Sequence, residues 1–187
     1  MSEETLTEVI TERKSGKNFD PTKRITDEHL KELIHAAHIA PSCYNEQPWR
    51  FIICNKATHN EAFQKVFSSL AEGNQKWAGN ASALIVVCAS NKYKRNGKEN
   101  RWGPYDSGAA AILMVLKATE LGLLTHQMGG FDEKKLAADF QIPEGFTPYA
   151  VMAVGFSGGH EDLPRNREPI QEHFFDGAWG NGISVKG

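Results

Sequence analysis

The stretch APSCYNEQPW, residues 40–49, separates a helical run from a short apolar run and sets how the chain around it folds. Its two prolines have a fixed φ and lack backbone donors, so the stretch forms neither a continuous helix nor a central strand. It carries three polar side chains, Ser42, Asn45 and Gln47, whose hydroxyl and amides suit the edge of a heterocycle. We therefore predict a binding loop here. The alternative is a plain connection whose Trp49 packs on the core.

Working outward, apolar periodicity predicts helices over 5–12, 27–39, 58–71, 105–121 and 132–140. Asp27 is expected to cap the second helix, with Ile34 in its apolar stripe. Apolar runs predict strands at 50–54, 83–89 and 149–154, and the run at 83–89 is apolar enough to be covered on both faces. Residues 73–79 are predicted to be irregular. The helix over 105–121 is apolar nearly all round, which places it in a core or across a subunit interface.

Composition excludes several classes of protein. A length of 187 residues indicates one domain, 1–187. The charges are nearly balanced, with 21 Lys+Arg against 23 Asp+Glu, so there is no electrostatic reason to expect a nucleic-acid or membrane partner. No apolar run is long enough to span a bilayer, and the acidic, polar N-terminus is unlike a signal peptide. The three cysteines match no disulfide or zinc pattern, and His35 and His38 lack further ligands, so no metal is expected. Cys54 and Cys88 are expected to be buried thiols, and the default location is cytoplasmic.

Two further clusters are candidates for ligand binding. Arg13, Lys14, Ser15 and Lys17 combine positive charge with a hydroxyl, as an anion pocket requires, although a solvated helix end has the same composition. Gly129 and Gly130 permit a backbone to approach a flat ligand, or form an ordinary turn. Arginines also recur at 165 and 167. Together these clusters offer what a flavin mononucleotide needs: a pocket for the phosphate, amides at the edge of the ring, and glycines whose backbone can lie close to the flat ring.

Ordered segments along almost the whole chain carry a resemblance to a known family. They are Arg13-Lys14-Ser15 with Phe19-Asp20, Ala40-Pro41-Ser42 with Asn45, Gln47, Pro48 and Trp49, Asp106-Ser107-Gly108-Ala109-Ala110, Glu120-Leu121-Gly122-Leu123, Gly129-Gly130-Phe131-Asp132, Val154-Gly155, and Leu163-Pro164-Arg165 with Arg167. In content and order the chain resembles the nitroreductase family of FMN-dependent NAD(P)H oxidoreductases. It departs from the family's usual Arg-Arg-Ser or Arg-His-Ser, because Lys14 stands in the middle position and Gly16 precedes Lys17.

The resemblance implies an α+β fold with a mostly antiparallel sheet flanked by helices, in an intertwined homodimer. The C-terminal tail (about 170–187) carries Phe174, Phe175 and Trp179 among glycines, and such an apolar tail is expected to dock on the partner subunit. The resemblance also implies two FMN sites that draw residues from both chains. Arg13, Ser15, Arg165 and Arg167 would hold the phosphate and ribityl chain, and Lys17 would tune the ring edge electrostatically. The full implied cofactor set is Arg13, Lys14, Ser15, Lys17, Pro41, Ser42, Cys43, Asn45, Gln47, Met128, Gly129, Gly130, Arg165 and Arg167.

The implied activity is reduction of nitroaromatics, quinones or similar acceptors by NADH or NADPH. In a ping-pong mechanism the flavin takes electrons from the nicotinamide and gives them to an acceptor in the same slot, so no catalytic side chain or metal is required. Another FMN enzyme of the scaffold (enone-reducing, dehalogenase-like or flavin-destroying) and a non-catalytic flavin-binding protein are the alternatives. The polar loop at 91–105 matches no pattern that would identify the acceptor.

Overall fold

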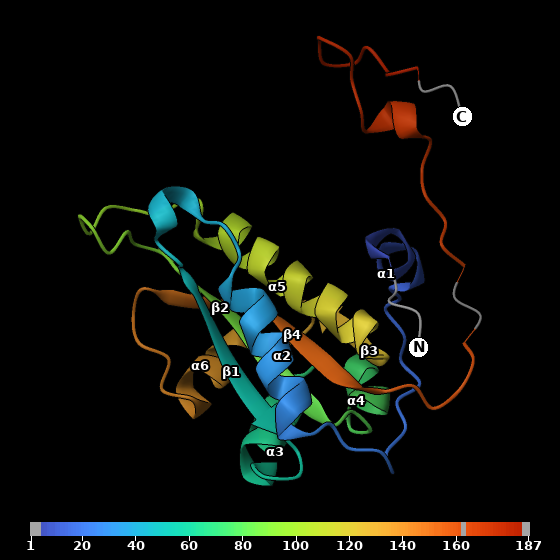
Figure 1. Ribbon diagram of the computed structural model, residues 1–187. Helices are drawn as coiled ribbons and strands as arrows, with labels where there is room; N and C mark the ends of the chain where they lie inside the picture. Colours follow the sequence, from blue (N-terminus) through green and yellow to red (C-terminus); the bar gives the residue numbers. More distant parts are fainter. Residues whose placement is uncertain (1–4, 162–163, 185–187) are drawn as a thin grey trace.

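The computed structural model describes residues 5–161 and 164–184 as four antiparallel strands with helices on both faces (Figure 1). Leu163, one of the residues that carry the family resemblance, lies outside the described residues. The last three residues of the tail, 185–187, lie outside them as well. The strand order is β1-β2-β4-β3 and every pair is antiparallel, which confirms the α+β prediction. The strands are β1 (Trp49–Asn55), β2 (Ala83–Ser90), β3 (Leu123–Met128) and β4 (Phe146–Phe156).

The helices form one layer on each face of the sheet. They are α1 (Leu6–Glu12), α2 (Asp27–His38), α3 (Asn60–Ser69), α4 (Glu72–Ala78), α5 (Gly103–Glu120) and α6 (Glu133–Asp139), with short 3-10 turns η1 (Cys43–Asn45) and η2 (Ile170–Glu172). Side chains of α2 and α5 pack with Ile85 and Val87, whereas those of α3, α4 and α6 pack with Leu84 and Val86. Since successive side chains of a strand point to opposite faces, β2 contributes to both cores, and all eight of its residues are buried as predicted.

Helix α5 is buried on one side only. Asp106, Ala110 and Met114 face the core, while Tyr105 and Ile112 on the opposite side are exposed. Helix α1 packs against α5 and leaves Leu6 exposed as well. The apolar composition of this helix predicted a position in a core or across an interface. One face of α5 lies in the core, and the opposite face is apolar and exposed.

Three local predictions are wrong. Thr26, not Asp27, caps α2, in a capping box with His29. Ile34 is exposed, and the smaller Ala36 takes its place in the buried stripe. Residues 73–78 of the predicted irregular segment lie in α4, with Gly79 as its C-cap, because packing on the core overrides the weak helical pattern: Trp77 stacks on Phe19 with ring centroids 6.0 Å apart.

The buried cysteines give a first testable prediction. Cys54 and Cys88 are 0% and 1% exposed, and burial raises the pKa of each thiol to about 11. The thiolate is the reactive form, so both should resist a thiol reagent such as Ellman's at pH 8 in the native protein. Unfolding in denaturant should release all three thiols, and rapid native labelling of more than one cysteine would contradict the predicted burial.

Candidate functional site

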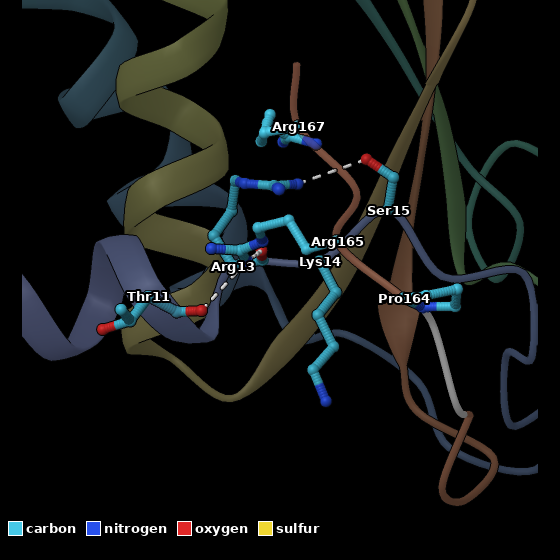
Figure 2. A pocket seen from close by; sticks show the side chains of 7 residues that line it. All are labelled: Thr11, Arg13, Lys14, Ser15, Pro164, Arg165 and Arg167. Atoms are coloured by element: carbon cyan, nitrogen blue, oxygen red, sulfur yellow. Dashed lines mark hydrogen bonds between the residues drawn. The ribbon is translucent and has the colours of Figure 1, made fainter. Parts of the chain in front are cut away.

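Residues from the two ends of the sequence form an open pocket of about 470 Å³ (Figure 2). This basic pocket is lined by Thr11, Arg13, Lys14, Ser15, Pro164, Arg165 and Arg167. The first four lie at the C-terminal end of α1 and the strand-like segment after it, and the other three lie on the segment that leads to the C-terminal tail. The structure therefore brings the two predicted cationic clusters together across some 150 residues of sequence.

Within the basic pocket the cations have different partners. The Nη1 of Arg13 donates to the Ser15 hydroxyl at 3.2 Å, so these two side chains point toward one another (Figure 2). The Nη2 of Arg165 donates to the carbonyl of Thr11 at 2.9 Å and also to that of Arg13. Arg165 thus closes the open carbonyl end of α1, a favourable place for a cation, and ties the C-terminal segment to it. Among the described residues, the one side-chain hydrogen bond of Arg167 runs from its Nη1 to the adjacent carbonyl of Asn166 at 2.8 Å.

The basic pocket carries four cations and lacks an acidic counterpart: within 5–161 and 164–184, none of Arg13, Lys14, Arg165 and Arg167 forms an ion pair. Partial burial, followed by the charges of Arg165 and Arg167, lowers the pKa of Arg13 below its usual value. A guanidinium remains charged nonetheless. Crowded like charges of this kind, with a hydroxyl among them, suit a dianion such as a phosphate monoester.

The chain after the basic pocket runs beside β3. Ser15 forms a parallel bridge with Thr125, and Lys17 follows with an exposed side chain. His126 and Glu161 contact the same segment through hydrogen bonds to its backbone. Lys17 therefore lies on the segment that leaves the basic pocket, with its side chain exposed, and its place at the edge of a flavin ring stays a prediction.

The predicted glycines follow the end of β3. From Thr125 to Gly129 the strand advances about 13 Å, so the glycines and the basic pocket flank one stretch of β3. A side-chain carbon at Gly129 would meet nothing within 4 Å, so the backbone there is open to a ligand, whereas Gly130 accepts from the amide of Ala71 at 2.9 Å. Met128 is buried, so only its backbone is available.

The loop at residues 40–49 has an unusual backbone. Tyr44, Asn45 and Gln47 all have positive φ, of 54°, 55° and 48°, a conformation that few residues other than glycine adopt. The Ser42 hydroxyl accepts from the Gln47 amide at 2.9 Å, and the buried Trp49 packs on the core. The plain-packing alternative thus holds for Trp49, while the residues before it are held in strained conformations of the kind that concentrate at functional sites.

This loop and the basic pocket lie at opposite ends of α5. At the first turn of α5, the amide of Cys43 donates to the Asp106 carboxylate at 3.0 Å. Near the last turn of α5, Thr119 and Lys14 line the same hollow. Thirteen helical residues separate those two points by about 20 Å. Pro41, Ser42, Cys43, Asn45 and Gln47 are therefore not brought to the basic pocket within one chain.

Sequence reasoning missed three residues that shape these regions. His126 and Glu161 hold the Ser15–Lys17 backbone, and the buried Glu46 accepts from the amide of Lys94 at 2.7 Å, which pins the polar loop at 91–105 to the loop at 40–49. Each contact joins residues more than 45 positions apart. A short motif carries no signal for such contacts.

Comparison with known proteins identifies the class. A sequence model described as the nitroreductase family matches residues 10–156, and the chain belongs to that family. Its fold matches a crystal structure described as an oxidoreductase containing FMN, with a TM-score of 0.85 and 32% identity over 97% of this chain and 96% of that one. A protein of Archaeoglobus fulgidus named as a candidate NADH dehydrogenase/NAD(P)H nitroreductase is 31% identical over 86% of this chain and 90% of its own length. An uncharacterised 15.4 kDa protein of Mycolicibacterium smegmatis is 34% identical over 71% and 98%.

Proposed function

We propose that this protein is an FMN-dependent oxidoreductase that uses NADH or NADPH to reduce nitroaromatics, quinones or similar acceptors by a ping-pong mechanism. The observation that carries the proposal is the basic pocket, whose four cations have no acidic partner among the described residues. Family membership and the FMN named for the similar crystal structure support the same cofactor. No helix in the described ranges has the length and apolar character to cross a membrane. The free cysteines suit a reducing, cytoplasmic location.

The residues of the basic pocket fit the phosphate end of FMN. Arg13 and Ser15 already share a hydrogen bond, and the Arg167 guanidinium beside them has nitrogens that form no hydrogen bond among the described residues (Figure 2). Lys14 adds charge at the rim. One nitrogen of Arg165, Nη2, donates to the carbonyls at the end of α1. Its remaining nitrogens are the part we assign to the phosphate and ribityl chain.

The ring end of the site would use residues farther along the same surface. Lys17 and the backbone of Met128, Gly129 and Gly130 are assigned to the ring on the same chain. The loop residues Pro41, Ser42, Cys43, Asn45 and Gln47 lie about 20 Å away along α5, so we assign them to the second site of a homodimer, where they would cover the ring of the partner. The exposed apolar face of α5 supports such a pairing.

When bound, FMN supplies the electron transfer between the nicotinamide and the acceptor. The protein supplies binding, orientation and charge. The basic pocket holds the phosphate and so fixes the cofactor against β3. The open backbone at Gly129 leaves room for a flat group. The exposed Tyr44 belongs to the loop assigned to the partner's site, where Arg95 lies over its ring at 3.7 Å, and the part of the ring that stays exposed is a surface on which an aromatic substrate can stack. No side-chain nucleophile is needed, because neither substrate forms a bond to the protein.

The assignment of the phosphate is tested by Arg167→Ala. Loss of one charge-assisted hydrogen bond is worth about 1.5–3 kcal/mol, so FMN should dissociate about 10- to 100-fold more readily. Folding should be unaffected, because Arg167 is exposed. Fluorescence titration of the apoprotein with FMN measures the change. Arg24→Ala, at an exposed arginine outside the basic pocket, is the matched control and should bind like the unsubstituted protein. FMN affinity unchanged by Arg167→Ala would overturn the assignment.

A further inference from the structure

The backbone of Ser15, Gly16 and Lys17 is held from two sides by side chains of distant elements. On one side His126 of β3 reaches the carbonyls of Ser15 and Gly16, and on the other Glu161, in the loop after β4, reaches the amide of Lys17. Neither contact is part of the ladder between strands. Both fall on the segment whose side chains are assigned to the cofactor.

The geometry shows which atom of His126 carries the proton. Its Nδ1 lies 3.0 Å from the Ser15 carbonyl and 3.2 Å from the Gly16 carbonyl. A carbonyl oxygen only accepts, so Nδ1 must be the protonated nitrogen and must donate to both. The ring is half-buried and lies on Trp77 with centroids 4.6 Å apart, which restricts it to this orientation. Burial, the largest influence, keeps the pKa of His126 below its usual value against the opposing effect of the two carbonyls, which favours the neutral ring.

The opposite side of the segment is equally restricted. The two carboxylate oxygens of Glu161 lie 3.0 and 3.2 Å from the Lys17 amide nitrogen. A side-chain carbon at Gly16 would overlap both Glu161 and Leu124, so only glycine allows the carboxylate to lie this close. The segment is thus held through two carbonyls by His126 and through an amide by Glu161.

We propose that His126 is a positioning residue for the cofactor site: its Nδ1–H fixes the Ser15–Gly16 backbone and thereby sets the direction of the Ser15 hydroxyl and the Lys17 ammonium. The inference rests on the proposed function, since it assigns these two groups to FMN. Without the donor, both carbonyls would turn to water and the two side chains would lose their common orientation. Preorganised donors bind better than mobile ones because less conformational entropy is lost on binding.

Three substitutions separate this role from simple packing. The amide nitrogen of asparagine lies two bonds beyond Cβ, as Nδ1 does, so His126→Asn retains the donor. His126→Gln places its nitrogen one bond farther out, and His126→Ala has none. The net value of such a hydrogen bond predicts FMN binding about 5- to 10-fold weaker for the Gln and Ala variants. The Asn variant should stay within about twofold of the unsubstituted protein, although it loses the ring and its contact with Trp77.

The decisive measurement is a double-substitution cycle on the midpoint potential of bound FMN. Lys17→Ala should shift the potential in the unsubstituted protein and shift it by less than half as much in the His126→Gln protein, because the ammonium is already misplaced there. A purely structural role for His126 predicts equal shifts in the two backgrounds. Thermal unfolding of each apoprotein, with amide exchange over residues 15–18, identifies any variant whose whole fold is weakened.

The outcomes are distinct. Tight binding by the Asn variant, weak binding by Gln and Ala, and non-additive potentials support the inference. Equal FMN binding by all three variants, equal weakening in all three, or additive potentials overturn it. If Gln and Ala variants fail to fold, the Asn variant alone decides: affinity and potential like those of the unsubstituted protein support the role, and a loss of either contradicts it. Failure of the unsubstituted apoprotein to bind FMN would instead overturn the proposed function.

Discussion

Removal of residues 170–187 is expected to give aggregates, or monomers that do not retain FMN. The described part of this tail covers almost none of its own chain and extends away from the body of the protein (Figure 1). Yet it carries Phe174 and Trp179, which are 58% and 93% exposed. Each aromatic side chain, when covered, buries about 150–250 Å². At about 25 cal/mol per Å² that is roughly 4–6 kcal/mol each as an upper bound, which a partner subunit can supply.

The surface that such a tail could cover is also present. An apolar groove of about 280 Å³ lies between α1, α2 and α5, lined in part by Leu6, Ile39 and Leu113. Leaving both the groove and the tail exposed would be costly for a monomer in water. We propose that two chains exchange their tails over such surfaces.

Light scattering coupled to size exclusion, with the absorbance of bound flavin recorded on the same peak, measures both consequences of the truncation. A full-length chain with Phe174→Ser and Trp179→Ser is the matched variant, because it retains the length and backbone of the tail and removes its apolar surface. It should weaken dimerisation and FMN retention in the same direction. A truncated protein that stays soluble and flavin-loaded at twice its chain mass would contradict docking on the partner.

Much of the fold was predictable because it depends on local patterns. The apolar run at 83–89 could only be a strand covered on both faces, and β2 is buried along its whole length. By contrast, residues 73–78 are helical because Trp77 packs on Phe19, which no local pattern encodes. Thr26 was overlooked because its box partner is His29 rather than the usual glutamate or glutamine.

The residues of the candidate site also separate into those that the sequence could predict and those that depend on contacts between distant segments. Arg13 and Arg167 could be grouped from sequence by their charge and by the family resemblance, and the structure places both in one pocket. His126 could not be found, because its role depends on β3 lying beside the segment at Ser15. The left-handed conformation of Tyr44 was equally hidden, since an aromatic residue gives no local reason to adopt it.

Lys17→Ala is expected to lower the midpoint potential of bound FMN and to slow its reduction by NAD(P)H, even in protein fully loaded with cofactor. The Lys17 side chain is exposed and forms no ion pair within the described ranges, so its charge is available to the cofactor. Positive charge at the ring edge favours the reduced state, which carries more negative charge, over the oxidised one. Such a differential effect changes the potential rather than binding alone.

The size of this shift follows from the environment of the charge. One unit charge at close range in a partly wet site is worth about 1–4 kcal/mol. For a two-electron couple 30 mV corresponds to about 1.4 kcal/mol, which gives a decrease of about 20–90 mV. The Glu161 carboxylate on the Lys17 amide opposes the ammonium, so the lower half of the range is expected. Lys17→Arg retains the charge and should recover most of the potential, while Lys134→Ala, at an exposed lysine on α6, should leave it unchanged. Potentiometric titration with stopped-flow reduction decides: a Lys17→Ala protein with an unaltered midpoint and reduction rate would show that this ammonium faces only solvent.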